Sequence, residues 1–245
     1  MRIIGSYVSP YVRKVLACLA LKGLSYEIDP IVPFYGDEEF ERLSPLRRIP
    51  VLIDGDLVIS DSSVICAYLD EAYPGHPLFP AGPADRARAR WLEEFADTRM
   101  GEVLIWRLFN QLAIKPAVWG EKADRTAVDK TIAEDLPAVL DYLESQVPAS
   151  GYLFGEIGVA DIALSAFFRN AGFVRFGIDA ARWPKTAAFV AGVLDHPALA
   201  HLRPFEEASI KVPVVGQREA VKAVGAPVTA QTCGTATPRP GVMAI

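Results

Sequence analysis

The sequence contains few cysteines and no cluster of them. Cys18, Cys66 and Cys233 are the three in 245 residues, and they are far apart and odd in number. Disulfide frameworks and zinc sites need closer spacing or pairs, so the sequence predicts neither, and no metal site. Cys18 and Cys66 are interpreted as small buried apolar residues on helices.

Long hydrophobic runs and charge blocks of one sign are also missing. No apolar run approaches the ~18 residues that a membrane span requires. The N-terminus has no basic region, apolar stretch and cleavage site of a signal peptide. The formal net charge of -5 is spread along the chain, whereas a nucleic-acid interface would need a basic face. We expect a cytoplasmic protein that binds neither nucleic acid nor membrane.

The C-terminal segment lacks large side chains. From about Pro213 onward the chain has no Leu, Phe, Tyr or Trp, so it can bury little area to offset the entropy of ordering. Residues 210–245 are therefore predicted to be a flexible Ala/Val/Gly/Pro-rich tail, whose removal after Ile210 should leave stability and activity almost unchanged. The alternative is that its valines cover the mouth of a site or contact a second subunit.

The remaining periodicity predicts two domains. Residues 1–75 have the order β-α-β-α-β-β-α, with a helical period over Pro10–Leu21 and a hairpin around Asp54-Gly55-Asp56. This indicates an α+β, thioredoxin-like domain. A Pro- and Gly-rich stretch gives a linker at 76–83.

Strand patterns nearly vanish after the linker, and residues 84–209 are predicted to form an all-α domain. Five helical patterns follow one another: 84–113, 125–147 with a kink at Pro137, 159–171, 183–194 and 197–207.

The turn between the first strand and the first helix carries the most informative residues. Pro10 suits a first helical position, and the N-terminus of a helix favours an anion. Redox proteins of this architecture have Cys-Pro-x-Cys here, but this chain has Ser9 and Val12, which excludes dithiol exchange. The Ser9 hydroxyl is either a hydrogen-bond donor to a bound thiolate or only an N-cap of the helix.

Two further segments favour a peptide ligand. A cis bond between Ile49 and Pro50 would turn the Ile49 backbone toward an extended ligand. Asp61 and Ser62 open the third helix and suit the ammonium and carboxylate of an amino acid, although a simple helix cap is the alternative.

In this order, Ser9-Pro10, Arg48-Ile49-Pro50-Val51-Leu52 and Asp61-Ser62 resemble the glutathione S-transferase family, over about residues 1–207. The resemblance is to its serine-type, cytosolic members. It implies glutathione as co-substrate without a metal, a small electrophilic substrate and a homodimer. It implies Ser9 as the activating hydroxyl and Arg48, Ile49, Pro50, Asp61 and Ser62 as glutathione-binding residues.

The resemblance leaves several points open. Tyr7 is a secondary candidate, and Arg13 and Lys14 are interpreted as solvated charges in preference to supports for the anion. Gly158 stands where the family has a Ser or Thr cap, so only half of a capping box with Asp161 is expected. A glutathione-dependent isomerase, or a binding protein without enzyme activity, is the alternative to a transferase.

Overall fold

The computed structural model describes residues 1–239 and divides the chain into two compact units. One unit comprises Met1–His76 together with the residues from His201 onward, and the other comprises Pro77–Ala200. The first division lies next to the predicted linker. The second division differs from the prediction of a helical domain that ends at 209 and a separate tail from 210. The helical unit ends at Ala200, and the chain that follows belongs to the N-terminal unit.

Four strands form one sheet in the N-terminal unit. They are β1 (Arg2–Ile4), β2 (Glu27–Asp29), β3 (Val51–Asp54) and β4 (Leu57–Ser60). The order across the sheet is β2-β1-β3-β4, in which β2 is parallel to β1 while β3 is antiparallel to both β1 and β4. The predicted hairpin and the mixed thioredoxin-like sheet are confirmed.

The helices of this unit are α1 (Pro10–Leu21), η1 (Pro33–Tyr35), α2 (Glu38–Leu43), α3 (Ser62–Ala72), α10 (Arg203–Ile210), η4 (Val214–Gly216) and α11 (Gln217–Ala223). Helix α1 has the predicted bounds, because Pro10 starts it and Gly23 follows it with a φ of 65°, a left-handed value that ends a helix. Where α1 packs on α3, the buried Cys18 and Cys66 sulfur atoms are 3.5 Å apart.

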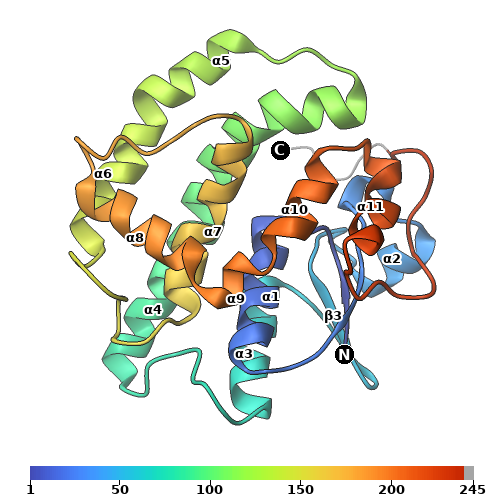
Figure 1. The fold of residues 1–245 in the computed structure, drawn as a ribbon, viewed down its shortest axis with the longest axis horizontal. Coiled ribbons are helices and arrows are strands. Elements are labelled where there is room, and N and C mark those ends of the chain that lie inside the picture. The colour runs from blue at the N-terminus through green and yellow to red at the C-terminus, as the bar shows by residue number, and fades with distance from the viewer. Residues whose placement is uncertain (240–245) are drawn as a thin grey trace. The chain divides into compact units, whose positions relative to one another are not determined.

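The prediction of a loose C-terminal tail is wrong for the described residues. The segment contains α11 and then pairs with the outer edge of β2, where Ile28 N donates to Pro227 O at 2.8 Å and Thr229 N donates to Ile28 O at 3.0 Å. Farther on, Asp37 N donates to Cys233 O at 2.8 Å, so the segment runs next to α2 (Figure 1). Composition gave a poor prediction here because backbone hydrogen bonds and the Arg218–Asp29 ion pair, not large apolar side chains, hold the segment.

Asp29, at the end of β2, is the main anchor of this segment. Its carboxylate is 3% exposed, and its two oxygens accept from Arg218 Nη1 at 2.8 Å and from Cys233 N at 2.7 Å. A buried carboxylate without such partners is unstable. The segment therefore both covers the edge strand and neutralises a buried charge.

The helices of the second unit are α4 (Pro83–Phe95), η2 (Ala96–Trp119), α5 (Arg125–Lys130), η3 (Thr131–Asp135), α6 (Leu136–Gln146), α7 (Val159–Phe173), α8 (Pro184–Asp195) and α9 (Pro197–Ala200). The all-α prediction is confirmed, with two differences in bounds. The long first helix continues past Pro116 to Gly120, whose φ of 67° ends it. The predicted last helix is split into α9 and α10, because Pro204 lacks the backbone donor that a continuous helix needs. No described helix is long and apolar enough to cross a membrane.

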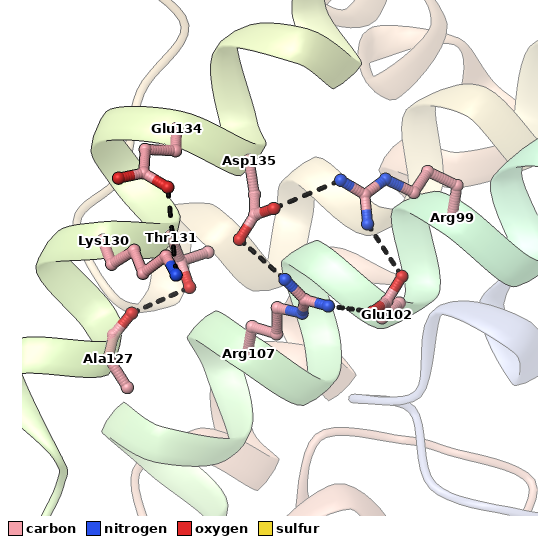
Figure 2. A network of polar contacts seen from close by, with 8 residues as sticks. All are labelled: Arg99, Glu102, Arg107, Ala127, Lys130, Thr131, Glu134 and Asp135. Carbon is pink, nitrogen blue, oxygen red and sulfur yellow. Dashed lines mark hydrogen bonds and ion pairs between the residues drawn. The ribbon is translucent and has the colours of Figure 1, made fainter.

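An ion-pair network joins η2 to η3 (Figure 2). Asp135 accepts from Arg99 at 3.2 Å and from Arg107 at 2.9 Å, and both arginines also pair with Glu102. Hydrogen bonds from Arg107 oppose the effect of burial and hold the pKa of Asp135 below its usual value. The network lies just before Pro137, where the winding changes from π to α.

Gly158, which precedes α7, explains the missing half of the capping box. Asp161 is fully buried and accepts from Gly158 N at 2.9 Å and from Leu153 N at 2.8 Å. A Cβ at Gly158 would lie 2.8 Å from the carbonyl oxygen of Leu78, which accepts from Val159 N at 2.9 Å. The close approach of these two backbones therefore excludes Ser or Thr at this position.

Deletion of the residues after Ile210 should destabilise the protein, by about 3 kcal/mol or more, since it leaves the buried Asp29 carboxylate without its cation and uncovers β2. Thermal melting of the full and shortened chains measures the loss. Arg218→Ala tests the anchor alone, with Lys222→Ala on the exposed face of α11 as control. An unchanged melting temperature, with rapid proteolytic trimming to about residue 210, would contradict the observed packing.

Gly158→Ser should destabilise the protein by roughly 1–3 kcal/mol through overpacking, although it completes a capping box in sequence. The matched control is Gly172→Ser in α7, where an added Cβ meets no atom within 4 Å and the change should be neutral or slightly stabilising. Urea denaturation compares the two. Equal or higher stability of Gly158→Ser would refute the steric argument.

Candidate glutathione site

The register of the sheet brings the predicted site residues to one end of the strands. Ile4 pairs with Asp29 and Val51, and Val51 pairs with Ser60, so one row of residues crosses all four strands. At this end of the sheet the chain leaves β1 toward Ser9, enters β3 from Pro50 and leaves β4 toward Asp61. Three segments far apart in sequence therefore share one end of the sheet.

Gly5 allows these segments to approach one another. Its φ of 153° lies in the region that favours glycine, and a Cβ there would lie 2.5 Å from a methyl group of Val12 and 3.3 Å from Cβ of Ile49. Its N–H donates to Asp29 O at 2.9 Å. Nothing in the sequence alone marks Gly5, because a lone glycine after a strand has many interpretations.

Ser9 is the N-cap of α1 and is half-buried. Its Oγ accepts from Val12 N at 3.4 Å, a long bond. This bond uses a lone pair and not the hydroxyl proton, which makes no hydrogen bond within the described chain. Capping and donation to a ligand are thus compatible, so the two interpretations of Ser9 need not compete.

The neighbours of Ser9 differ from expectation. Burial raises the pKa of the Tyr7 hydroxyl far above its usual value, and the side chain is 1% exposed, which makes it a poor activator. Arg13 and Lys14 are each 1% exposed, so the prediction of solvated charges is wrong. Arg13 pairs with the buried Glu206 of α10, and Lys14 Nζ donates to Ser63 Oγ at 3.1 Å.

The segment before β3 has the predicted cis bond between Ile49 and Pro50. Within the described residues, no hydrogen bond is found to the Ile49 backbone N–H. Arg48 is exposed and Pro50 is buried. The buried Ser44 hydroxyl contacts both the N–H and the carbonyl of Arg48. The sequence did not predict Ser44 as part of the site, because no pattern marks it.

Asp61 is the N-cap of α3, as the cap interpretation requires. Oδ1 accepts from Ser63 N at 2.9 Å and from Val64 N at 3.0 Å. The residue is exposed, and in the described structure Oδ2 makes no hydrogen bond. Ser62, at the first helical position, is 4% exposed. One carboxylate oxygen therefore stabilises the helix while the other faces solvent.

The described residues also form a cavity that is separate from the predicted site residues. A cavity of about 680 Å³ in the helical unit is lined by residues around Leu78, Phe79, Arg88 and Phe154, and by none of the predicted site residues. Among residues 1–239, no group of three or more His, Cys, Asp and Glu side chains is arranged to hold a metal ion.

The sequence matches a known protein family. The family model described as "Glutathione S-transferase, N-terminal domain" matches residues 3–77. A glutathione S-transferase of Triticum aestivum is 42% identical over 76 residues, which are 31% of this chain and only 35% of that protein. Glutathione S-transferase Z2 of Arabidopsis thaliana is 30% identical over 209 residues, 83% of this chain and 91% of its own length.

The fold agrees as well. A crystal structure of a glutathione S-transferase from Rhodospirillum rubrum F11 has a TM-score of 0.75 and 26% identity, covering 82% of this chain and 90% of that one. The thioredoxin-like sheet with its helical unit is thus the architecture of glutathione S-transferases. This chain belongs to the glutathione S-transferase family, an enzyme family that uses glutathione.

The far end of the hairpin is tied to α3 by two tyrosines. Tyr73 and Tyr68 donate to Asp54 Oδ2, the latter at 2.8 Å. These hydrogen bonds lower the pKa of Asp54 below its ordinary value. Because Asp61 caps the N-terminus of α3, this contact helps to fix the helix that begins at the candidate site.

The tyrosine contacts predict a pH-dependent stability. The folded-state pKa of Asp54 is depressed, so the ionised carboxylate stabilises the folded protein. This stabilisation is complete above the ordinary carboxyl pKa of about 4 and is lost as the pH falls through the folded-state pKa. The double variant Tyr68→Phe/Tyr73→Phe should lose more stability at neutral pH than near pH 3. Urea denaturation at both pH values tests this, with Tyr152→Phe as control. A pH-independent loss would show that Asp54 is not involved.

Proposed function

We propose that this protein is a glutathione transferase in which Ser9 activates the glutathione thiol. The observation that carries the proposal is the Ser9 hydroxyl, whose proton is uncommitted at the N-terminus of the twelve-residue helix α1. Hydroxyl and helix dipole act on the same atom, because both favour a negative charge placed beside Ser9.

The magnitudes suffice for activation at neutral pH. A free thiol has a pKa of about 8.5, and one pKa unit corresponds to about 1.4 kcal/mol. A hydrogen bond to a charged group contributes about 1.5–3 kcal/mol and a helix dipole about 0.3–1 kcal/mol. Together they lower the thiol pKa by roughly one to three units, to about 5.5–7.5, so that a large fraction of the thiol is ionised at neutral pH. Tyr7 is a weaker candidate, since its buried hydroxyl has a raised pKa.

The rest of the glutathione molecule fits the other two segments. We assign the Ile49 backbone to the cysteinyl residue, with Arg48 and Pro50 beside it. We assign Asp61 and Ser62 to the γ-glutamyl end, where the unoccupied carboxylate oxygen of Asp61 suits the ligand ammonium and the start of α3 suits the carboxylate. None of these groups takes part in the chemistry, so they set affinity and orientation.

The proposed reaction is nucleophilic. The thiolate attacks an electrophilic carbon, a carbon–sulfur bond forms and the leaving group departs with its electron pair. With a peroxide, a sulfur–oxygen bond forms as the oxygen–oxygen bond breaks and an alcohol departs; a second glutathione thiolate then attacks the sulfur, which gives a disulfide and water. An isomerase would use the same thiolate and release it unchanged. The non-enzymatic alternative is disfavoured because Ser9, Ile49-Pro50 and Asp61-Ser62 are all present and share one end of the sheet. We further propose that the protein is cytoplasmic and forms a homodimer. Light scattering, which measures the molar mass in solution, tests the dimer.

Ser9→Ala should bind glutathione nearly as well as the parent but lower kcat about 10- to 100-fold at neutral pH, as expected for the loss of a charge-assisted hydrogen bond. Ultraviolet absorbance of the bound thiolate, followed against pH, should give a higher thiol pKa in the variant. Ser6→Ala, at a buried serine in the same turn, is the control. An unchanged titration would transfer the activating role to another group.

A further inference from the structure

Ser44 is a fully buried residue that connects two segments of the candidate site. It follows α2 as its C-cap and is 0% exposed. Its Oγ lies 3.0 Å from Arg48 N, 2.8 Å from Arg48 O and 2.9 Å from Oγ of Ser60. Arg48 immediately precedes Ile49, and Ser60 immediately precedes Asp61. One hydroxyl therefore contacts the residue before each of these two predicted glutathione-binding residues.

The hydrogen bonds of this hydroxyl have only one consistent arrangement. Ser44 has one proton, which it donates to the Arg48 carbonyl, and two lone pairs. One lone pair accepts from Arg48 N–H, which leaves the other for the Ser60 hydroxyl as donor. The Ser44 hydroxyl is therefore saturated, and it fixes the peptide groups on both sides of Arg48.

The backbone between Ser44 and Arg48 needs such support. Arg47 N donates to Ser44 O at 2.7 Å, which closes a turn with Pro45 at its second position. Arg47 then has a φ of 52°, a left-handed conformation unfavourable for a side chain with a Cβ. Such conformations persist where surrounding contacts hold them, and both hydrogen bonds of the next residue are made to Ser44.

We propose that Ser44 is a positioning residue for glutathione: it holds the backbone that presents Ile49 to the cysteinyl part and, through Ser60, keeps this segment in register with Asp61. The inference rests on the proposed function, since it assigns glutathione to these segments. Ser44 contacts no reacting atom, so it acts on the affinity for glutathione and not on the activation of the thiol.

The test separates KM from kcat. Ser44→Ala should raise the KM for glutathione about tenfold, the loss expected for one to two hydrogen bonds, with kcat within about twofold of the parent. Ser60→Ala keeps both contacts to Arg48 and should raise KM only about twofold. Ser44→Cys keeps the volume but hydrogen-bonds weakly, so it should raise KM as well and serves if Ser44→Ala does not fold.

Calorimetry with glutathione distinguishes the possible failures. If the parent protein does not bind glutathione, the proposed function fails and this inference fails with it. If the parent binds and the Ser44 variants bind equally well, only the role of Ser44 is refuted. A fall in kcat or in the folded fraction with an unchanged KM would also overturn it, because it would show a purely structural role.

Discussion

The pairing of Asp29, Ile4, Val51 and Ser60 in one row across the sheet is the constraint on which the N-terminal unit depends. Since side chains alternate along a strand, a slip of one residue in any pair would turn the following segment to the wrong face. The row fixes where β1 releases the chain toward Ser9, where β3 begins and where α3 starts. It also sets the position of Asp29, which anchors the C-terminal segment. The site and its supports thus follow from one register.

Charge at this end of the sheet is controlled by burial. Arg13 and Asp29 are both inside the unit, and each has an oppositely charged partner, Glu206 of α10 and Arg218 of α11 respectively. Such pairs are costly to break but contribute little net stability when intact. Their consequence is specificity of arrangement: α10 and α11 each have one position in which no buried charge is left without its partner.

Local signals in the sequence predicted the local structure. Pro10 and Gly23 bound α1, and Asp61 caps α3, because these effects act over a few residues. The sequence could not show contacts between distant segments. It gave no sign that Arg13 meets Glu206, that Ser44 holds Arg48, or that Leu78 excludes a side chain at Gly158. The C-terminal segment was mispredicted for the same reason, since its partner β2 lies about 200 residues earlier.

We propose that glutathione lies along this end of the sheet with its sulfur at Ser9. A crystal structure of the complex with glutathione tests this placement most directly. We expect the sulfur within hydrogen-bonding distance of Ser9 Oγ, the cysteinyl backbone paired with Ile49 and the ammonium group at Asp61. A sulfur atom placed away from Ser9, or a γ-glutamyl group that does not contact α3, would contradict it.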